Sequence, residues 1–181
     1  MEDALVSGLD SLSPPDIHYV NAAWGWLDLD NIAEAFAELD RVSRPAQANV
    51  DVLTLRWELF ARRKQWEEAL EVARTLVQLA PDRADSWIKQ SYGLHELKRT
   101  QEAWDALLPV SEHFPEISTI AYNLACYACQ LNQTQASLTW LRSAMRLGGK
   151  ESVRKMAMKD ADLKALWVQI KKLTIPARRA A

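Results

Sequence analysis

The feature that most constrains the fold of this chain is a repeat of 34 residues. Small residues recur at this spacing, at Ala35, Ala69, Ala103 and Ser137. Two prolines, Pro81 and Pro115, are separated by the same interval. A fixed period of this length is typical of a protein built from stacked structural repeats, each of which buries its apolar face against the next. We therefore divide the sequence into four windows, 16–49, 50–83, 84–117 and 118–151.

Each window contains two amphipathic segments. Their apolar and small positions are spaced three and four residues apart, which is the period of an α-helix with one buried face. The first window places at these positions Tyr19, Ala23, Trp26, Leu39 and Val42. Asn31 followed by Glu34 predicts the capped start of a second helix. The prolines near the ends of two windows predict where a second helix stops, so each window reads as a helix pair.

This pattern resembles the tetratricopeptide repeat family, which has the same period, a bulky–small–bulky first helix, and then Ala, a bulky residue and Pro. The window 84–117 matches it best, with Trp87, Ser91, Leu94, Ala103, Leu107 and Pro115. The resemblance covers residues 16–151. It implies an all-α fold, a right-handed superhelical α-solenoid of antiparallel helix pairs. A solenoid also needs a C-terminal cap, because its last repeat otherwise exposes apolar surface.

We expect one domain over residues 1–181 with distinct ends. The segment 1–15 has Leu5, Leu9 and Leu12 at helical spacing. It either caps the first helix, which is apolar on both sides from Ile17 to Leu27, or leaves that helix open to a partner. Residues 152–173 are predicted to form capping helices, and residues 174–181 a flexible tail. The cap's apolar stripe comprises Met156, Met158, Leu163, Leu166, Trp167 and Ile170.

Two windows depart from the pattern. Trp57 stands where the other windows have a small residue, and Ala73 stands where they have Leu. We interpret this as a large-for-small exchange that keeps the packed volume constant, which requires Trp57 and Ala73 to touch. In the third window Pro109 lies inside the second helix and predicts a kink there, because proline has no backbone N–H to donate.

The net charge of −2 argues against polyanion binding by the molecule as a whole. The charge is uneven, however, because residues 150–181 carry +6 and the remainder −8. Two cysteines are too few for a disulfide framework. The start of the chain lacks the basic region of a secretory signal, and no apolar run is long enough to span a membrane. We therefore predict a cytoplasmic protein.

The resemblance implies a partner-binding groove on the concave surface, lined by the first helix of each repeat. Helix geometry then selects the side opposite the core. With neighbouring rim positions, the candidates are Val20, Asn21, Trp24, Leu27, Glu58, Arg62, Ile88, Tyr92, His95, Glu96, Tyr122, Asn123, Cys126 and Cys129. Aromatic residues and an excess of acid predict a peptide or helix with apolar anchors and a basic flank. The Lys/Arg/Asn clamp that some family members use for a C-terminal carboxylate is missing from the corresponding positions.

The sequence offers little support for catalysis. Cys126 and Cys129 form a CxxC, but they fall in mid-helix and lack the strand context of a redox site. Zinc would need four ligands, and no second pair is present. Nothing completes a catalytic set with His95, and no Gly-rich phosphate loop occurs. We therefore predict no enzyme activity, no metal and no cofactor.

The leading interpretation is a non-enzymatic scaffold that docks a segment of another protein in the groove. One alternative is a small chaperone that masks an apolar segment of a client. Another is nucleic-acid binding through the basic C-terminal region. Two oligomeric states stay open, a monomer and a weak dimer that associates through the apolar first repeat.

Overall fold

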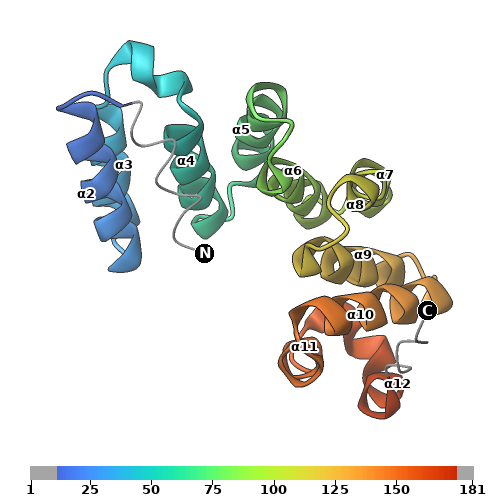
Figure 1. Ribbon diagram of the computed structural model, residues 1–181. Helices are drawn as coiled ribbons and strands as arrows, with labels where there is room; N and C mark the ends of the chain where they lie inside the picture. Colours follow the sequence, from blue (N-terminus) through green and yellow to red (C-terminus); the bar gives the residue numbers. More distant parts are fainter. Residues whose placement is uncertain (1–11, 175–181) are drawn as a thin grey trace. The chain divides into compact units, whose positions relative to one another are not determined.

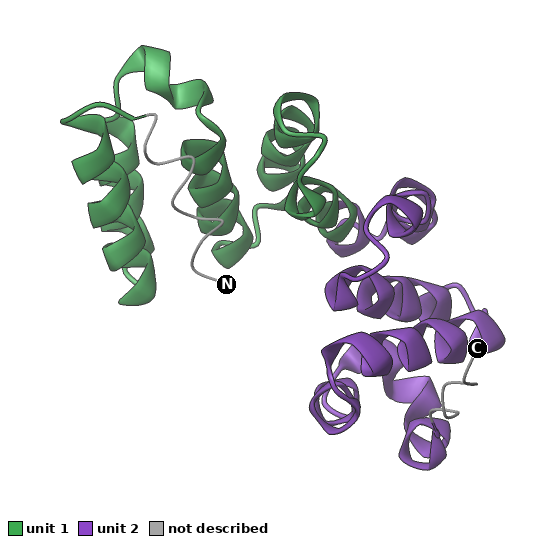
Figure 2. Ribbon diagram, in the orientation of Figure 1, with its two compact units in different colours: residues 1–93 green, residues 94–181 purple. Residues whose placement is uncertain are grey.

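A computed structural model describes residues 12–174 (Figure 1), and these residues form α-helices and short 3-10 helices with no β-strand among them. The all-α class predicted from the sequence is confirmed. The chain groups into two compact units, Met1–Gly93 (unit 1) and Leu94–Ala181 (unit 2), which Figure 2 colours separately.

The helices follow the predicted windows. Unit 1 contains α2 (Asp16–Asp28), α3 (Ile32–Asp40), the 3-10 helix η1 (Arg44–Ala48), α4 (Val50–Arg62) and α5 (Trp66–Leu79). Helix α6 (Ala84–Glu96) contains the boundary, and α7 (Thr100–Leu107), α8 (Val110–His113), α9 (Ser118–Gln130), α10 (Thr134–Gly148), α11 (Lys150–Ala157), η2 (Ala161–Leu166) and α12 (Trp167–Lys172) follow. The first helices α2, α4, α6 and α9 begin at the first residue of each window, Asp16, Val50, Ala84 and Ser118.

The turn that ends each first helix has the same geometry in all four repeats. One residue per turn adopts a left-handed conformation, with φ between 56° and 63°, at Asp30, Lys64, Lys98 and Asn132. The residue after it donates its backbone N–H to a carbonyl five residues earlier, as Gln65 does to Phe60 at 2.9 Å. This is the Schellman arrangement for satisfying free carbonyls at a helix end. None of these four residues is glycine, and the sequence analysis did not identify the position.

The small residues that revealed the period are all in the interior. All four are fully buried, namely Ala35, Ala69, Ala103 and Ser137. Ser137 on α10 donates its hydroxyl to the Ala125 carbonyl on α9 at 2.7 Å, so the fourth repeat adds a buried hydrogen bond where the others have a methyl group. A small side chain is required here because the two helices of a pair pack against each other through it.

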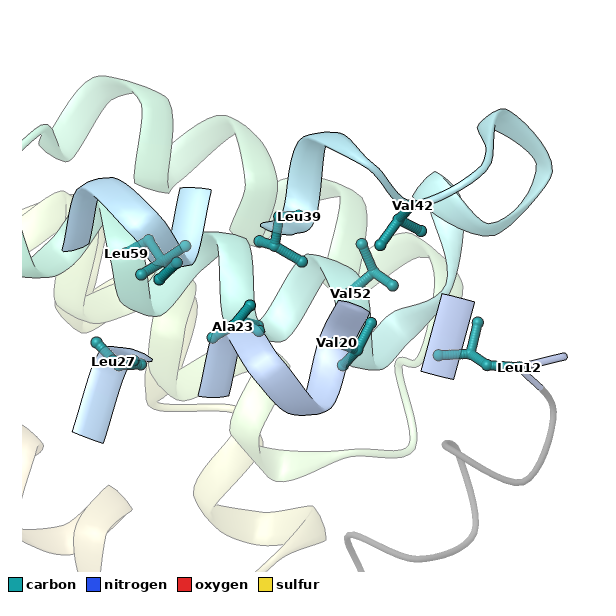
Figure 3. Close-up of a cluster of buried hydrophobic side chains, with 10 residues drawn as sticks. Leu12, Val20, Ala23, Leu27, Leu39, Val42, Val52 and Leu59 are labelled. Atoms are coloured by element: carbon teal, nitrogen blue, oxygen red, sulfur yellow. The ribbon is translucent and has the colours of Figure 1, made fainter. Parts of the chain in front are cut away.

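The core of unit 1 is built by α2, α3 and α4. Figure 3 shows side chains from these helices pointing toward one another, among them Val20, Leu39 and Val52. Leu12 is buried in the same cluster, whereas Leu5 and Leu9, which were expected to continue a helical cap, lie outside the described residues. Asn31 caps α3 as predicted, because its side-chain oxygen accepts the backbone N–H of Glu34.

The two departures from the repeat pattern have structural counterparts. Trp57 and Ala73 lie in one buried cluster together with Ala69, and their direct contact stays a prediction. The second helix of the third repeat is interrupted at Pro109, which separates α7 from α8. The proline therefore interrupts the helix, as expected from its missing N–H, and the kink itself stays a prediction.

The C-terminal cap consists of α11, η2 and α12. Leu163, Leu166 and Ile170 are buried as predicted. Met156 is 49% exposed, so its assignment to the apolar stripe was wrong. The inward positions of α11 belong instead to Val153 and Ala157, which are four residues apart on one side of the helix. Of the predicted tail, residues 175–181 lie outside the described residues.

Candidate partner-binding surface

The candidate residues of unit 1 divide between its core and its surface. Val20 and Leu27 are buried in the core cluster, so they stabilise the unit and expose almost no area to a ligand. Trp24 is half-buried and packs against that cluster with its remaining area open. We call the six candidates that keep exposed or half-exposed side chains the first-helix surface of unit 1, namely Asn21, Trp24, Glu58, Arg62, Ile88 and Tyr92.

Tyr92 is the aromatic residue best placed for contact on this surface. It is 37% exposed and lies against two tryptophans. Its ring centroid is 6.3 Å from that of Trp57 and 5.6 Å from that of Trp66, with both pairs in edge-on arrangements. Edge-to-face pairs of this kind are favourable and restrict the rotation of each ring. Tyr92 is therefore a pre-oriented aromatic side chain with one side open.

The buried Lys89 neutralises part of the negative charge of the first-helix surface. Its ammonium nitrogen lies 3.0 Å from a Glu58 carboxylate oxygen and 2.9 Å from one of Asp85. It also lies 4.8 Å from the centre of the Trp57 ring. A buried ammonium requires such partners, because an unpaired charge in the interior is costly. Two carboxylates share one cation, so this triad keeps a net negative charge.

Other acidic side chains of unit 1 are also paired. Arg62 binds Asp30 at 3.1 Å between exposed side chains. Arg83 lies 3.5 Å from a carboxylate oxygen of the buried Asp51. The acid excess counted from the sequence is therefore partly neutralised by the unit's own basic residues.

A hollow of about 510 Å³ near the start of α2 lies apart from the first-helix surface. Its charged residue, Asp16, accepts the backbone N–H of Ser43 at 2.7 Å and the Ser43 hydroxyl at 2.6 Å. These two hydrogen bonds lower the pKa of Asp16, and the bond from the Ser43 hydroxyl has the larger effect. Because the carboxylate is satisfied within unit 1, we assign the hollow no ligand.

In unit 2 most of the candidate residues are buried. Tyr122, Cys126 and Cys129 on α9 are each less than 10% exposed, and so is His95. Asn123 and Glu96 are half-buried. Helix α9 is covered along most of its length, since every residue from Leu124 to Cys129 is buried. A helix buried on all sides must have a segment lying over its ligand-facing side as well.

The covering segment is formed by residues 160–166, which we call the acidic turn. Asp160 caps η2 by accepting the backbone N–H of Asp162 at 2.9 Å. Its second carboxylate oxygen accepts the Tyr122 hydroxyl at 2.7 Å, and the Cys126 thiol at 3.6 Å. Gln130 donates to the Asp162 carbonyl at 2.7 Å. Hydrogen bonds from α9 thereby hold the acidic turn at two of its residues, Asp160 and Asp162.

His95 holds the second carboxylate of the acidic turn. Its Nε2 lies 3.0 Å from Asp162 Oδ2, and its Nδ1 lies 3.1 Å from the Thr100 hydroxyl. The imidazole also packs against the Tyr127 ring, with centroids 4.8 Å apart. The hydrogen bond from His95 is the main cause that lowers the pKa of Asp162, and the positive charge of Lys98 acts in the same direction.

The two thiols of the CxxC lie in a setting that suppresses their reactivity. Desolvation is the first cause that raises the pKa of Cys126 and of Cys129, and the charges of Asp160 and Asp162 raise both further. A protonated thiol is a poor nucleophile and a poor metal ligand. Within the part of the chain that the structure describes, no group of three or more His, Cys, Asp or Glu side chains is arranged to hold a metal ion.

Asp160 and Asp162 were not among the residues predicted from the sequence to line the surface. An Asp two residues before another Asp, followed by an apolar stripe, is a signal for a helix cap and would have located the turn. It carries no information about contact with α9, because Tyr122 and Asp160 are 38 positions apart.

The described helices include none that is long and apolar enough to cross a membrane. No protein-family model and no curated protein sequence matches the chain. Solved structures match it at low sequence identity. MamA from Desulfovibrio magneticus RS-1, residue 41 to the end, has a TM-score of 0.69 at 16% identity, covering 90% of this chain and 97% of that one. PilF from Pseudomonas aeruginosa has a TM-score of 0.69 at 20% identity, covering 94% and 76%.

Both neighbours are tetratricopeptide-repeat proteins. The likeness extends over nine-tenths of this chain or more in each case. At such low identity the agreement concerns the backbone and says nothing of ligands. Together with the equal spacing of the helix starts, it shows that this chain has the tetratricopeptide-repeat fold.

Proposed function

We propose that the protein is a non-enzymatic interaction module and that the first-helix surface of unit 1 docks a segment of a partner protein. The observation that carries the proposal is the pre-oriented aromatic group, in which Trp57 and Trp66 hold Tyr92 with one side exposed. Rigid aromatic side chains contribute large contact areas while losing little conformational entropy, and they dominate many binding interfaces. Trp24 on α2 and Ile88 on α6 supply further partly exposed apolar area on the first helices.

The partner segment is expected to carry apolar anchors beside a basic flank. The Glu58–Lys89–Asp85 triad keeps one uncompensated negative charge. Asp28 adds a further exposed carboxylate at the end of α2. A Lys or Arg next to the anchors is attracted to these groups, which favours correct orientation of the segment and faster association. We place this activity in the cytoplasm, where the two free cysteines stay reduced.

Site-specific photo-crosslinking in the native host tests the proposal. A photoreactive amino acid replaces Arg62 in one protein and Leu79 in a control. Both positions are well exposed in unit 1, but Leu79 ends a second helix and lies outside the first-helix surface. We expect a partner to be captured from position 62 and not from position 79. Adding Tyr92→Ala should abolish that capture, because losing a central aromatic contact typically weakens binding by about 2 kcal/mol.

Equal capture from both positions, or capture that survives Tyr92→Ala in a protein with unchanged circular dichroism, would reject this surface. The captured partner also separates a scaffold from a chaperone. A partner that is insoluble without the protein and co-purifies with it in equal amounts would assign the chaperone role instead.

A further inference from the structure

The acidic turn lies on the side of α9 where the repeat pattern places a ligand. Tyr122 and Cys126 were predicted to face a partner, and both instead hydrogen-bond to Asp160 of the same chain. Gln130, at the end of the same helix, binds the next part of the turn. A segment of the protein itself thus occupies the position expected for a bound peptide.

The side chains that face the acidic turn are hydrogen-bond donors. A carboxylate only accepts hydrogen bonds, so the His95 Nε2 that lies 3.0 Å from Asp162 carries the proton. The Tyr122 hydroxyl and the Gln130 amide also donate to the turn. Lys98 contributes positive charge toward Asp162. This surface therefore has the chemistry to recognise carboxylates, unlike the acidic first-helix surface of unit 1.

The acidic turn is built in a way that favours local detachment. η2 is a 3-10 helix, whose hydrogen bonds are poorer than those of an α-helix. Three of its six residues, Ala161, Lys164 and Ala165, are exposed. Segments of this kind open at a lower free energy than the whole fold. Opening would uncover α9 without requiring its pairing with α10 to break.

We propose that the acidic turn is a detachable occupant of α9, and that the uncovered surface binds an acidic segment of a partner protein. The proposal rests on the proposed function in treating the first helices as docking surfaces. The segment that fits has two carboxylates separated by one residue and then an apolar residue. It would reproduce the hydrogen bonds of Asp160 and Asp162, together with the fully buried contact of Leu163.

Thiol labelling of the full chain tests detachment, since Cys126 and Cys129 lie beneath the acidic turn and are buried. The variant Asp160→Asn/Asp162→Asn should be labelled about tenfold faster than wild type or more, because hydrogen bonds to charged groups are stronger than neutral ones. A matched control, Glu102→Gln/Glu151→Gln, also removes two carboxylates from unit 2, both exposed and each paired with an arginine three residues away. The control should be labelled at the wild-type rate.

The dependence of labelling on low concentrations of denaturant identifies the event that exposes the thiols. Local detachment gives a rate that is nearly independent of denaturant, because little surface is uncovered. A rate that follows global unfolding in both wild type and the variant would overturn the proposal, since the turn would then be an inseparable part of the fold. Tyr122→Phe, which removes one hydroxyl, gives the same test in a less altered protein.

A labelled peptide with the sequence of residues 158–168 tests the ligand. We expect it to bind the Asp160→Asn/Asp162→Asn protein about tenfold more tightly than wild type, where the turn competes. A peptide with Asn at both Asp positions should bind about tenfold more weakly. Equal affinities for the two peptides would overturn the carboxylate recognition. A wild-type dimer with protected thiols would assign the surface to a second copy of the chain and would likewise overturn it.

These results are independent of the crosslinking at Arg62. Loss of the partner there with fast thiol labelling would reject the surface of unit 1 and keep that of α9. Capture of a partner at position 62 together with slow thiol labelling would keep unit 1 as the docking surface. The acidic turn would then be a fixed cap, which rejects the present inference.

Discussion

At the scale of single residues, the four left-handed positions hold side chains that this conformation disfavours. A non-glycine residue there costs about 1 kcal/mol or more, because its Cβ crowds the backbone. Lys64, with φ of 56°, is exposed and has no packing role that a smaller residue would lose. We expect Lys64→Gly to raise the free energy of unfolding by about 0.5–1 kcal/mol, part of the gain being offset by the flexibility of glycine in the unfolded chain.

Chemical denaturation measures this change, and the neighbouring residue provides the control. Arg63 has an ordinary φ of −81°. Arg63→Gly should therefore lower the free energy of unfolding by at least about 0.5–1 kcal/mol, since glycine adds flexibility without relieving strain, and it also removes the guanidinium that lies 4.5 Å from the centre of the Phe36 ring. Charge cannot explain changes of opposite sign in the free energy of unfolding at these adjacent positions, because both substitutions remove one positive charge. A destabilising effect at Lys64 would contradict the strain argument.

The four left-handed positions could not be predicted from the sequence. Glycine usually marks such a turn, and here the residues are an aspartate, two lysines and an asparagine, namely Asp30, Lys64, Lys98 and Asn132. The small residues of the period were easier to identify because a steric requirement admits only Ala or Ser. A structural position can be recognised in the sequence when only one or two residue types fit it, as at the small buried positions. It cannot be recognised when several residue types fit at a moderate cost in free energy, as at the left-handed positions.

At the scale of elements, α7 and α8 are separated by Leu108 and Pro109. The backbone at Pro109 has φ of −61° and ψ of −31°, which is already helical. An alanine there needs no rearrangement, and it restores a donor to the Asp105 carbonyl. We expect Pro109→Ala to join the two helices and to raise the free energy of unfolding by less than the roughly 3 kcal/mol that an interior proline costs.

Circular dichroism and amide hydrogen exchange together check this expectation. Helix content should rise slightly, and the amides from residue 108 to residue 113 should become more protected. Leu108→Ala, at an exposed position one residue earlier, is a control that leaves the break in place and should leave the protection unchanged. Unchanged protection in Pro109→Ala would show that the break is imposed by packing instead of by the proline ring.

Helix boundaries were predictable from the sequence, whereas the cover on α9 was not. Periodicity defines which side of a helix faces its own partner helix, so the starts at Asp16, Val50, Ala84 and Ser118 agree with the windows. The side opposite the core was taken as open to ligands. Which later segment returns to cover it depends on contacts such as that between Tyr122 and Asp160, and no local pattern encodes these.

At the scale of the whole molecule, two carboxylates with lowered pKa values link folding to pH. Asp16 in unit 1 is held by Ser43, and Asp162 in unit 2 by His95. A carboxyl whose pKa is lower in the folded protein stabilises it above the unfolded value of 3.8. That contribution is lost as the pH falls through the folded pKa. The protein should therefore lose stability steeply under acid conditions.

Asp16→Asn should remove part of this acid sensitivity. The variant is expected to be less stable than wild type at neutral pH, and the difference should shrink as the pH falls below 3.8, where the wild-type carboxyl also becomes neutral. Denaturation curves recorded at a series of pH values give the comparison. Ser43→Ala, which removes the hydroxyl donor and keeps the backbone donor, should show the same convergence with a smaller gap. Parallel curves for wild type and both variants would refute this linkage.

The repeated turn has a consequence for how this chain changes length in evolution. Helix starts and left-handed residues recur every 34 positions, so residues 50 and 84, the first residues of the second and third windows, stand in equivalent surroundings. Recombination at such points removes or duplicates a window without altering the local backbone at the joint. Insertions or losses of other sizes inside a helix move the apolar positions beyond them off the buried face of that helix. Chains that evolve from this one by gain or loss of whole repeats should therefore differ from it in length by multiples of 34 residues.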